Sequence, residues 1–161
     1  LNLLIQRKEI GDTKPVFTKE DKGGILNFYV RDKVIMRKNN KEIGVMNGDI
    51  GYILGKQGNN DLLIQFDKEV TLPFKDCYNL DLAYAISIHS SQGSEYRGVI
   101  IPISLEHQFM LSRNLIYTAI TRGKEKVILF GQENAFRNAL KYVARDLRYT
   151  NLSYVLKDLR K

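Results

Sequence analysis

Cysteine and histidine are scarce in this chain of 161 residues, and no apolar run is long enough to cross a membrane. The single cysteine, Cys77, excludes an internal disulfide framework and a zinc site made of several cysteines. Two histidines, His89 and His107, leave little material for a histidine-rich metal site. The apolar run at residues 99–103 is far too short to span a bilayer. We therefore expect a cytoplasmic chain with no metal site and no membrane partner.

The motifs of several enzyme classes are absent as well. No G-x-x-x-x-G-K-[ST] occurs, because Gly55-Lys56 and Gly123-Lys124 are not followed by serine or threonine. Neither G-x-S-x-G nor H-E-x-x-H is present, and no apolar stretch ends in an acidic pair suited to Mg²⁺. The chain is therefore not expected to bind and hydrolyse a nucleotide by itself as P-loop enzymes do.

What the chain does contain is positive charge and enough apolar residues for a core. It has 25 Lys plus Arg against 18 Asp plus Glu, a net charge of +7 and a pI near 9.4. Hydrophobic residues make up 43%, which disfavours disorder. The length suits one domain, or one domain with a small insert. The charge fits a nucleic-acid partner, but it equally fits a basic surface that is merely solvated.

The first half of the chain has the pattern of short β-strands. Residues 1–6 (LNLLIQ) are mostly apolar and predict the end of a helix. They lack an initiator methionine, so we expect a piece of a longer protein. Residues 7–24 contain Pro15 and Gly23-Gly24 and are predicted to be a connector. Short apolar segments separated by turns then follow, at 34–36, 50–54, 61–66 and 69–74. Their spacing of about ten residues predicts a small antiparallel β barrel.

After Asp81 the pattern changes to alternating strands and helices. Apolar runs predict strands covered on both faces, at 82–88, 99–103 and 126–130. Helices are predicted at 111–121, about 133–147 and 151–159. The expected fold is α/β: a leading helix and connector (1–24), an inserted β barrel (25–78) and a parallel α/β domain (79–161).

The predicted helix at 111–121 has two contrasting faces. Ile116, Ala119 and Ile120 share one face, which we expect to pack in a core. The other face carries Arg113, Asn114, Tyr117, Thr118, Thr121 and Arg122. It could be a solvated face, with Arg122 and Lys124 placed favourably at the helix C-terminus. This residue set is better suited to a ligand, because the planar fork of an arginine can donate two hydrogen bonds to a phosphate.

A run of small polar residues follows the strand predicted at 82–88. It reads His89-Ser90-Ser91-Gln92-Gly93-Ser94-Glu95. Ligands bind beyond the C-terminal ends of strands in open α/β sheets, so this loop is a candidate site. The alternative is a plain turn, in which Gly93 supplies backbone freedom and the serines cap a helix.

These two segments resemble motifs of a known family. LAYAISIHSSQGSEY (82–96) resembles motif V of superfamily 1 helicases, and NLIYTAITRGK (114–124) resembles their motif VI. LNLLIQ (1–6) is similar to the short helix at motif IV. Residues 32–36 and 45–51 resemble the Src-homology-3-like barrel inserted in the second RecA-like domain of these enzymes. Over nearly its whole length the chain is similar to RecD-type helicases, the exodeoxyribonuclease V alpha subunits, and to conjugative relaxase-helicases.

The resemblance implies a role for each candidate residue. Arg122 would be the arginine finger that reaches the γ-phosphate of ATP held by an N-terminal RecA-like domain. Gln92, Gly93 and Glu95 would lie beside it, at the nucleotide side of the cleft between the domains. The residues implied to contact single-stranded DNA, or to relay between DNA and nucleotide, are His89, Ser90, Ser91, Tyr117 and Thr118.

The implied enzyme is an ATP-dependent 5′-to-3′ DNA helicase. ATP and Mg²⁺ would be bound mainly by the N-terminal domain, so this chain alone should be inactive. Its partners would be single-stranded DNA, that domain and, in some relatives, other subunits of a nuclease-helicase complex. Two positions depart from the family. Ser90 replaces a common lysine, so a phosphate-contacting charge is missing or moved, and Gly123 replaces a common alanine, which costs up to about 1 kcal/mol if that position is helical.

Two functions of other classes stay open at this level. A stand-alone nucleic-acid-binding module would use the barrel, bind in a salt-sensitive way and need no Arg122. A protein-interaction domain would bind a partner insensitively to salt and have no affinity for nucleic acid. Decay of the upstream half would leave a helicase relative that is no longer a motor.

Overall fold

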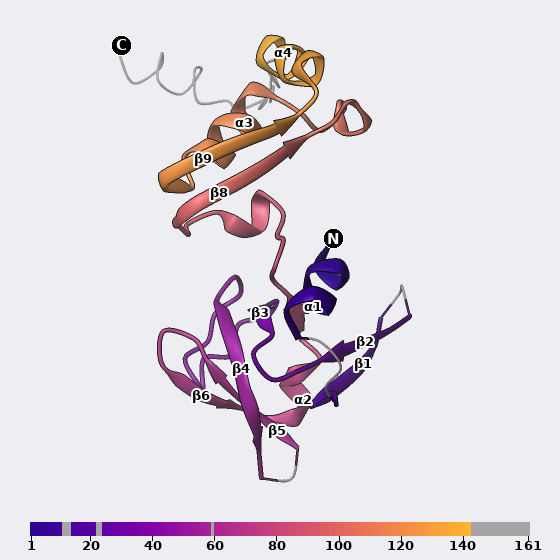
Figure 1. Ribbon diagram of the computed structural model, residues 1–161. Helices are drawn as coiled ribbons and strands as arrows, with labels where there is room; N and C mark the ends of the chain where they lie inside the picture. The colour runs from indigo at the N-terminus through magenta and orange to yellow at the C-terminus, as the bar shows by residue number, and fades with distance from the viewer. Residues whose placement is uncertain (11–13, 22–23, 59, 143–161) are drawn as a thin grey trace, which may run out of the picture. The chain divides into compact units, whose positions relative to one another are not determined.

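The computed structural model describes residues 1–10, 14–21, 24–58 and 60–142. The chain divides into two compact units, Leu1–Ser91 and Gln92–Lys161 (Figure 1). The first unit contains two antiparallel sheets and the second a parallel sheet, so the fold is mixed α/β, as the sequence predicts. The boundary between the units falls inside the run of small polar residues.

A helix and a β-hairpin open the first unit. The elements are α1 (Asn2–Ile10), β1 (Phe17–Asp21) and β2 (Gly24–Phe28). The helix predicted at 1–6 is confirmed and is longer, and the plain connector predicted at 7–24 is wrong, because β1 pairs antiparallel with β2. β1 is not predicted from the sequence, because its residues are mostly polar and lack the apolar alternation of a typical strand. Its Lys19 is only 8% exposed and donates to the carbonyl oxygens of Tyr78 and Leu80.

A five-stranded antiparallel sheet with the order β6-β5-β4-β3-β7 forms the body of the first unit. Its strands, with one short helix, are β3 (Lys33–Met36), β4 (Ile50–Gln57), β5 (Asp61–Gln65), β6 (Glu69–Leu72), α2 (Phe74–Cys77) and β7 (Leu80–Leu82). The strands predicted at 34–36, 50–54 and 61–66 are confirmed. The strand predicted at 69–74 is confirmed as far as Leu72, since α2 begins at Phe74.

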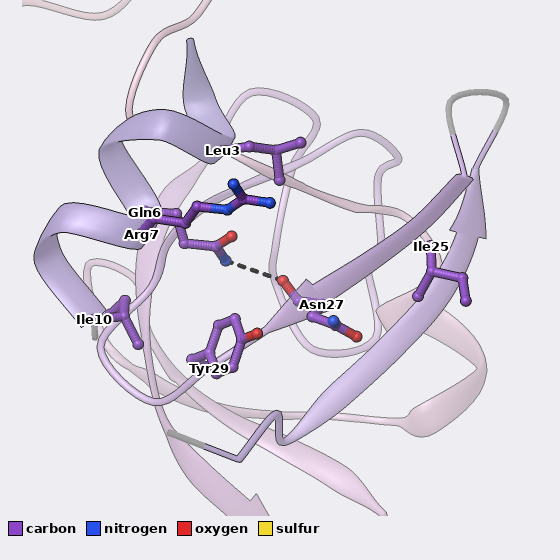
Figure 2. A pocket seen from close by; sticks show the side chains of 7 residues that line it. All are labelled: Leu3, Gln6, Arg7, Ile10, Ile25, Asn27 and Tyr29. Atoms are coloured by element: carbon purple, nitrogen blue, oxygen red, sulfur yellow. Dashed lines mark hydrogen bonds between the residues drawn. The ribbon is translucent and has the colours of Figure 1, made fainter. Parts of the chain in front are cut away.

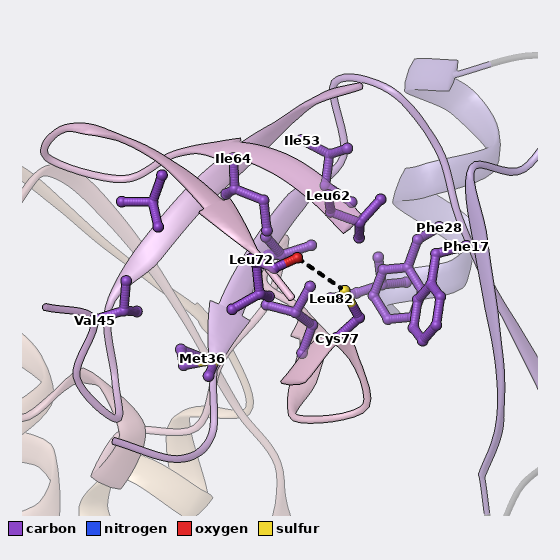
Figure 3. Packing of buried hydrophobic residues seen from close by; sticks show 13 residues of the cluster. Phe17, Phe28, Met36, Val45, Ile53, Leu62, Ile64, Leu72, Cys77 and Leu82 are labelled. Atoms are coloured by element: carbon purple, nitrogen blue, oxygen red, sulfur yellow. Dashed lines mark hydrogen bonds between the residues drawn. The ribbon is translucent and has the colours of Figure 1, made fainter. Parts of the chain in front are cut away.

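The apolar side chains of this sheet and of the hairpin form one core (Figure 3). Burial alternates along β6, because successive side chains of a strand point to opposite faces. The core contains Phe17, Phe28, Val34, Met36, Val45, Ile53, Leu62, Ile64, Val70, Leu72, Cys77, Leu80 and Leu82. Burial raises the pKa of Cys77 to about 12, so this thiol is neutral and serves as a core residue.

The strand predicted at 82–88 is wrong. β7 ends at Leu82, and it pairs antiparallel with β3, Leu82 lying opposite Val34. Further along, the backbone of Ala85 is satisfied by a side chain: its N–H donates to Asn2 Oδ1 at 2.6 Å, and its carbonyl accepts from Asn2 Nδ2 at 2.9 Å. The apolar run therefore leaves the sheet and is held by α1.

The second unit begins with a strand, a helix and a second strand. Its elements are β8 (Tyr96–Ile103), η2 (Leu105–His107), α3 (Arg113–Ile120), β9 (Gly123–Gly131) and α4 (Glu133–Lys141). β8 and β9 run parallel, Val99 lying opposite Val127. The predicted strands at 99–103 and 126–130 and the predicted helix at 111–121 are confirmed. α4 confirms the first part of the helix predicted at 133–147, and the helix predicted at 151–159 lies outside the described residues.

This parallel pair is covered less completely than the sequence predicts. Ile116 and Ala119 of α3 are buried, and α3 contacts both strands. Ile120, expected in the core, is 36% exposed. Ile100 and Phe130 are each 69% exposed, so strands covered on both faces are not found among the described residues.

Candidate functional site

Arg122 follows the C-terminal end of α3, where three acceptors hold its guanidinium group. Nε donates to the Thr118 carbonyl at 3.2 Å, Nη1 to the Ser94 carbonyl at 3.0 Å and Nη2 to Thr121 Oγ1 at 3.3 Å. These acceptors are uncharged, and no carboxylate pairs with Arg122 within the part of the chain that the structure describes. Arg122 thus covers carbonyls at a helix end, yet its charge is not neutralised by direct contact.

The segment that leads into β8 lies against Arg122. The Tyr96 N–H donates to the Arg122 carbonyl at 2.8 Å, two residues after Ser94 accepts from the Arg122 side chain. Glu95, between them, forms an exposed ion pair with Lys124 at 2.9 Å. The hydrogen bond and charge of Lys124, with a smaller contribution from Arg122, hold the pKa of Glu95 below its usual range. The structure therefore brings two predicted site residues, Glu95 and Arg122, to one edge of the second unit.

The other predicted residues of this unit are less tightly tied to Arg122. Gln92 and Gly93 are exposed, and Gly93 has φ = +84°, a conformation that favours glycine. Tyr117 is 70% exposed on α3. The Thr118 hydroxyl donates to the Asn114 carbonyl of its own helix at 2.8 Å. The Thr118 carbonyl, not its hydroxyl, contacts the Arg122 side chain.

Three of the five residues predicted for the DNA site form a short 3₁₀ helix, η1 (His89–Ser91), in the first unit. Ser91 is 6% exposed, and its hydroxyl donates to the Ile88 carbonyl at 2.7 Å, so it shapes the turn. His89 is exposed and Ser90 is half-buried. Ser90 Oγ lies 2.8 Å from Ser87 Oγ, so two hydroxyls are adjacent at this surface.

Ser90 is also the acceptor of a hydrogen bond that comes from the five-stranded sheet. Arg37 Nη1 donates to Ser90 Oγ at 3.0 Å, while Arg37 Nε donates to Asp81 Oδ2 at 2.7 Å. The other oxygen of Asp81 pairs with Lys19 Nζ at 2.9 Å. Burial acts to raise the pKa of Asp81, but the hydrogen bonds and charges of Lys19 and Arg37 outweigh it and hold that pKa below its usual range.

Sequence reasoning missed Arg37 and Asp81. Arg37 is 53 positions from Ser90 and directly follows a strand whose pairing partner is distant in sequence. The register that places Ile35 opposite Asp81 brings them together. A polar stretch after an apolar strand, such as residues 37–42, carries no local signal of such a contact.

Two of the hollows on the described part of the first unit lie apart from the predicted site residues. One, of about 150 Å³, lies between α1 and β2 and is lined by Leu3, Gln6, Arg7, Ile10, Ile25, Asn27 and Tyr29. Figure 2 shows Gln6 reaching across it to donate to the Asn27 carbonyl, at 2.9 Å. The other, of about 500 Å³, is a wider groove that includes Tyr52, Leu54 and Tyr84.

No metal-binding group is found among the residues that the structure describes, since no three His, Cys, Asp or Glu side chains gather in a suitable cluster. In the same residues, no helix combines the length and apolarity needed to cross a membrane. Arg37 and Arg122 are two residues whose guanidinium groups could hold an anion.

Comparison with known proteins bears on the segment that contains η1 and Arg122. Residues 82–130 match the family model of the UvrD-like helicase C-terminal domain. The ATP-dependent RecD2 DNA helicase of Deinococcus radiodurans is 37% identical over 109 residues, which is 67% of this chain and 15% of that protein. The RecBCD enzyme subunit RecD of Haemophilus influenzae is 28% identical over 137 residues, covering 83% of this chain and 20% of that one.

The chain therefore spans a fifth or less of these curated relatives. Among solved structures, Bacteroides Pif1 bound to ssDNA is similar with a TM-score of 0.62 and 18% identity, over 98% of this chain and 42% of that chain. At that identity the likeness concerns the fold, and it agrees with the mixed α/β architecture seen here.

Proposed function

We propose that this chain is the C-terminal motor domain of an ATP-dependent 5′-to-3′ DNA helicase. The chain is homologous to RecD-type superfamily 1 helicases, and its residues 82–130 match the UvrD-like helicase C-terminal domain. The observation that carries this proposal is the match at 82–130, because this one segment contains η1, the Gln92–Tyr96 stretch and Arg122. In the intact protein, ATP and Mg²⁺ would be held mainly by an N-terminal RecA-like domain. The five-stranded sheet would be the Src-homology-3-like insert.

Arg122 would act as the arginine finger. Its support is chemical: the guanidinium is partly exposed and bonded only to uncharged groups. A phosphate oxygen in place of one of these uncharged acceptors would add the attraction of opposite charges to the hydrogen bond, and the guanidinium fork suits such an oxygen. An arginine placed at the transferred phosphoryl group stabilises the charge that develops there.

The exposed stretch with Gln92, Gly93 and Glu95 would line the nucleotide side of the interdomain cleft. The hydrogen bonds of Ser94 and Tyr96 with Arg122 support this, because a movement of the stretch would shift the position of Arg122. Glu95, already paired with Lys124, is suited to orienting charged neighbours. The hydrogen bond and charge of Lys124 lower the pKa of Glu95 and so favour its ionised form.

Single-stranded DNA would run past η1, with His89 and Ser90 touching its backbone. Thr118 or Tyr117 would relay between the DNA and nucleotide sites. Burial of Ser91 and the use of its hydroxyl favour a supporting role for that residue. The protein would act in the cytoplasm, alone or with further subunits of a nuclease-helicase complex, and this chain by itself would be inactive.

The test is strand separation by the full-length protein. We expect ATP hydrolysis to be stimulated by single-stranded DNA, and a duplex with a 5′ tail to be unwound in preference to a matched duplex with a 3′ tail. A matched duplex without a tail is the control. DNA binding without ATP hydrolysis would favour a plain nucleic-acid-binding module. The absence of both DNA binding and ATP hydrolysis would contradict the proposal.

A further inference from the structure

We infer that Arg37, together with Ser87 and Ser90, binds a backbone phosphate of single-stranded DNA. This phosphate cluster, as we name the three residues, rests on the proposed function for the identity of its polyanion. It extends the DNA contact from η1 to the residue that follows β3, on the five-stranded sheet. Nothing in the sequence motifs points to Arg37.

The backbone of the sheet fixes where the Arg37 side chain begins. Ile35 lies opposite Asp81 in the pairing of β3 with β7, and the ladder continues as the Arg37 N–H donates to the Asn79 carbonyl at 2.8 Å. Arg37 and Asp81 are therefore diagonal neighbours on one face of the sheet, a separation that long side chains bridge. Their 2.7 Å hydrogen bond is the result.

Asp81 orients the guanidinium without consuming its charge. The carboxylate is shared, because Lys19 Nζ bonds one oxygen at 2.9 Å and Arg37 Nε the other at 2.7 Å. Two cations and one anion leave the group with a net charge of +1. The Lys19 side chain is 9% exposed and the Arg37 side chain 39% exposed, so the surplus is available to a ligand through Arg37.

Hydrogen-bond donors are in surplus in the phosphate cluster. Ser90 Oγ accepts from Arg37 Nη1, and Ser87 Oγ accepts from the Ser90 N–H at 3.2 Å. One hydroxyl hydrogen serves the 2.8 Å bond between the two Oγ atoms, and the other has no acceptor among the described residues. Arg37 Nη2 likewise has no acceptor in that set. A cluster that offers N–H and O–H donors with one positive charge fits a phosphate oxygen.

The setting favours a phosphodiester of a strand over a small phosphorylated ligand. Arg37, Ser87 and Ser90 do not line either of the two hollows described above, and Ser87 is exposed, whereas small-molecule sites are clefts or cavities that bury most of the ligand. An open surface with one charge suits a polyanion that meets several such points along a groove. Ser90 lies in η1, which the proposed function already places on the DNA path.

The experiment measures binding of the full-length protein to a fluorescent oligothymidylate by anisotropy, over a series of salt concentrations. We expect Arg37→Gln to weaken binding about three- to tenfold and to lower the slope of log K against log salt by about 0.7, the value for one phosphate contact with a single strand. Arg37→Lys, which keeps the charge, should keep the wild-type slope. The control is Arg137→Gln, an exposed arginine paired with Glu133 on α4, which should match wild type.

The inference and the proposed function fail in different ways. Wild-type slope and affinity in Arg37→Gln, with ATP hydrolysis still stimulated by DNA, would overturn the role of Arg37 and leave the helicase proposal standing. Thermal unfolding distinguishes a structural role of Arg37 from a DNA-binding role. If the melting temperature falls equally in both Arg37 variants and both keep the wild-type salt slope, Arg37 serves only to connect β3 with η1. A wild-type protein that binds no single-stranded DNA would overturn both.

Discussion

At the scale of single residues, the same side chain can satisfy a structural and a functional need. Arg122 bonds a carbonyl of the last turn of α3, as a helix-end cation does, and reaches back to Ser94. Its neighbour Gly123, which stands where the family commonly has alanine, is explained by its place in the structure. Gly123 is the first residue of β9 and not part of a helix, so the cost expected for a helical glycine does not apply.

Gly123 is needed because its surroundings are crowded. A Cβ at this position would lie 2.5 Å from Val127 Cγ2 and 3.2 Å from the Lys126 carbonyl oxygen. We expect Gly123→Ala to lower the free energy of unfolding by about 1–3 kcal/mol, the range for overpacked sites. Gly98→Ala on β8 is the control, since its Cβ would meet nothing closer than 3.9 Å. Urea unfolding measures both, and equal stability of the two variants would contradict the crowding.

At the scale of elements, α1 ties together the sheet and the segment before η1. Gln6 Nε2 donates to the buried Asp32 at 2.6 Å, and Tyr84 donates to the other Asp32 oxygen at 2.8 Å. Burial raises the pKa of Asp32, and hydrogen bonds from Tyr29, Tyr84 and Gln6 offset this only in part. Asn2 completes the tie through Ala85.

The Asn2 contact predicts a local effect. Replacing Asn2 by alanine leaves the N–H and carbonyl of Ala85 without their partner, at a cost of about 1–3 kcal/mol. We expect Asn2→Ala to speed hydrogen exchange of the Ala85 amide and the amides up to η1, while β8 and β9 stay unchanged. Asn2→Asp, which keeps an acceptor for the Ala85 N–H, should have a smaller effect. Uniform exchange changes across both units would contradict a local tie.

The same elements show what the sequence can predict and why. α3, β8 and β9 carry their own apolar periodicity, and their existence follows from it. The run at 82–88 carries an equally strong apolar signal, yet it leaves the sheet because Asn2, 83 positions from Ala85, supplies its hydrogen bonds. Arg37 reached Ser90 through a strand register that no local pattern encodes. Predictions failed where distant partners satisfied the backbone or set the contact.

At the scale of the whole molecule, we propose that the chain is one domain of a larger helicase. It spans 15% of the RecD2 helicase of Deinococcus radiodurans and 20% of the Haemophilus influenzae RecD subunit. No phosphate-binding loop with the Walker pattern occurs in its sequence. Its contribution to catalysis would therefore be charge placed by Arg122 and a surface for DNA, with nucleotide binding supplied elsewhere.

The most direct measurement is ATP hydrolysis by the full-length protein, with and without single-stranded DNA, for wild type and Arg122→Ala. Nucleotide binding is measured separately. The control is Arg97→Ala, which removes an arginine of β8 that is exposed and paired with Glu125. We predict that the DNA-stimulated rate falls at least about a hundredfold in Arg122→Ala, with ATP still bound, and is unchanged in the control. An unchanged rate in Arg122→Ala would contradict the account and leave Arg122 as a helix-end charge.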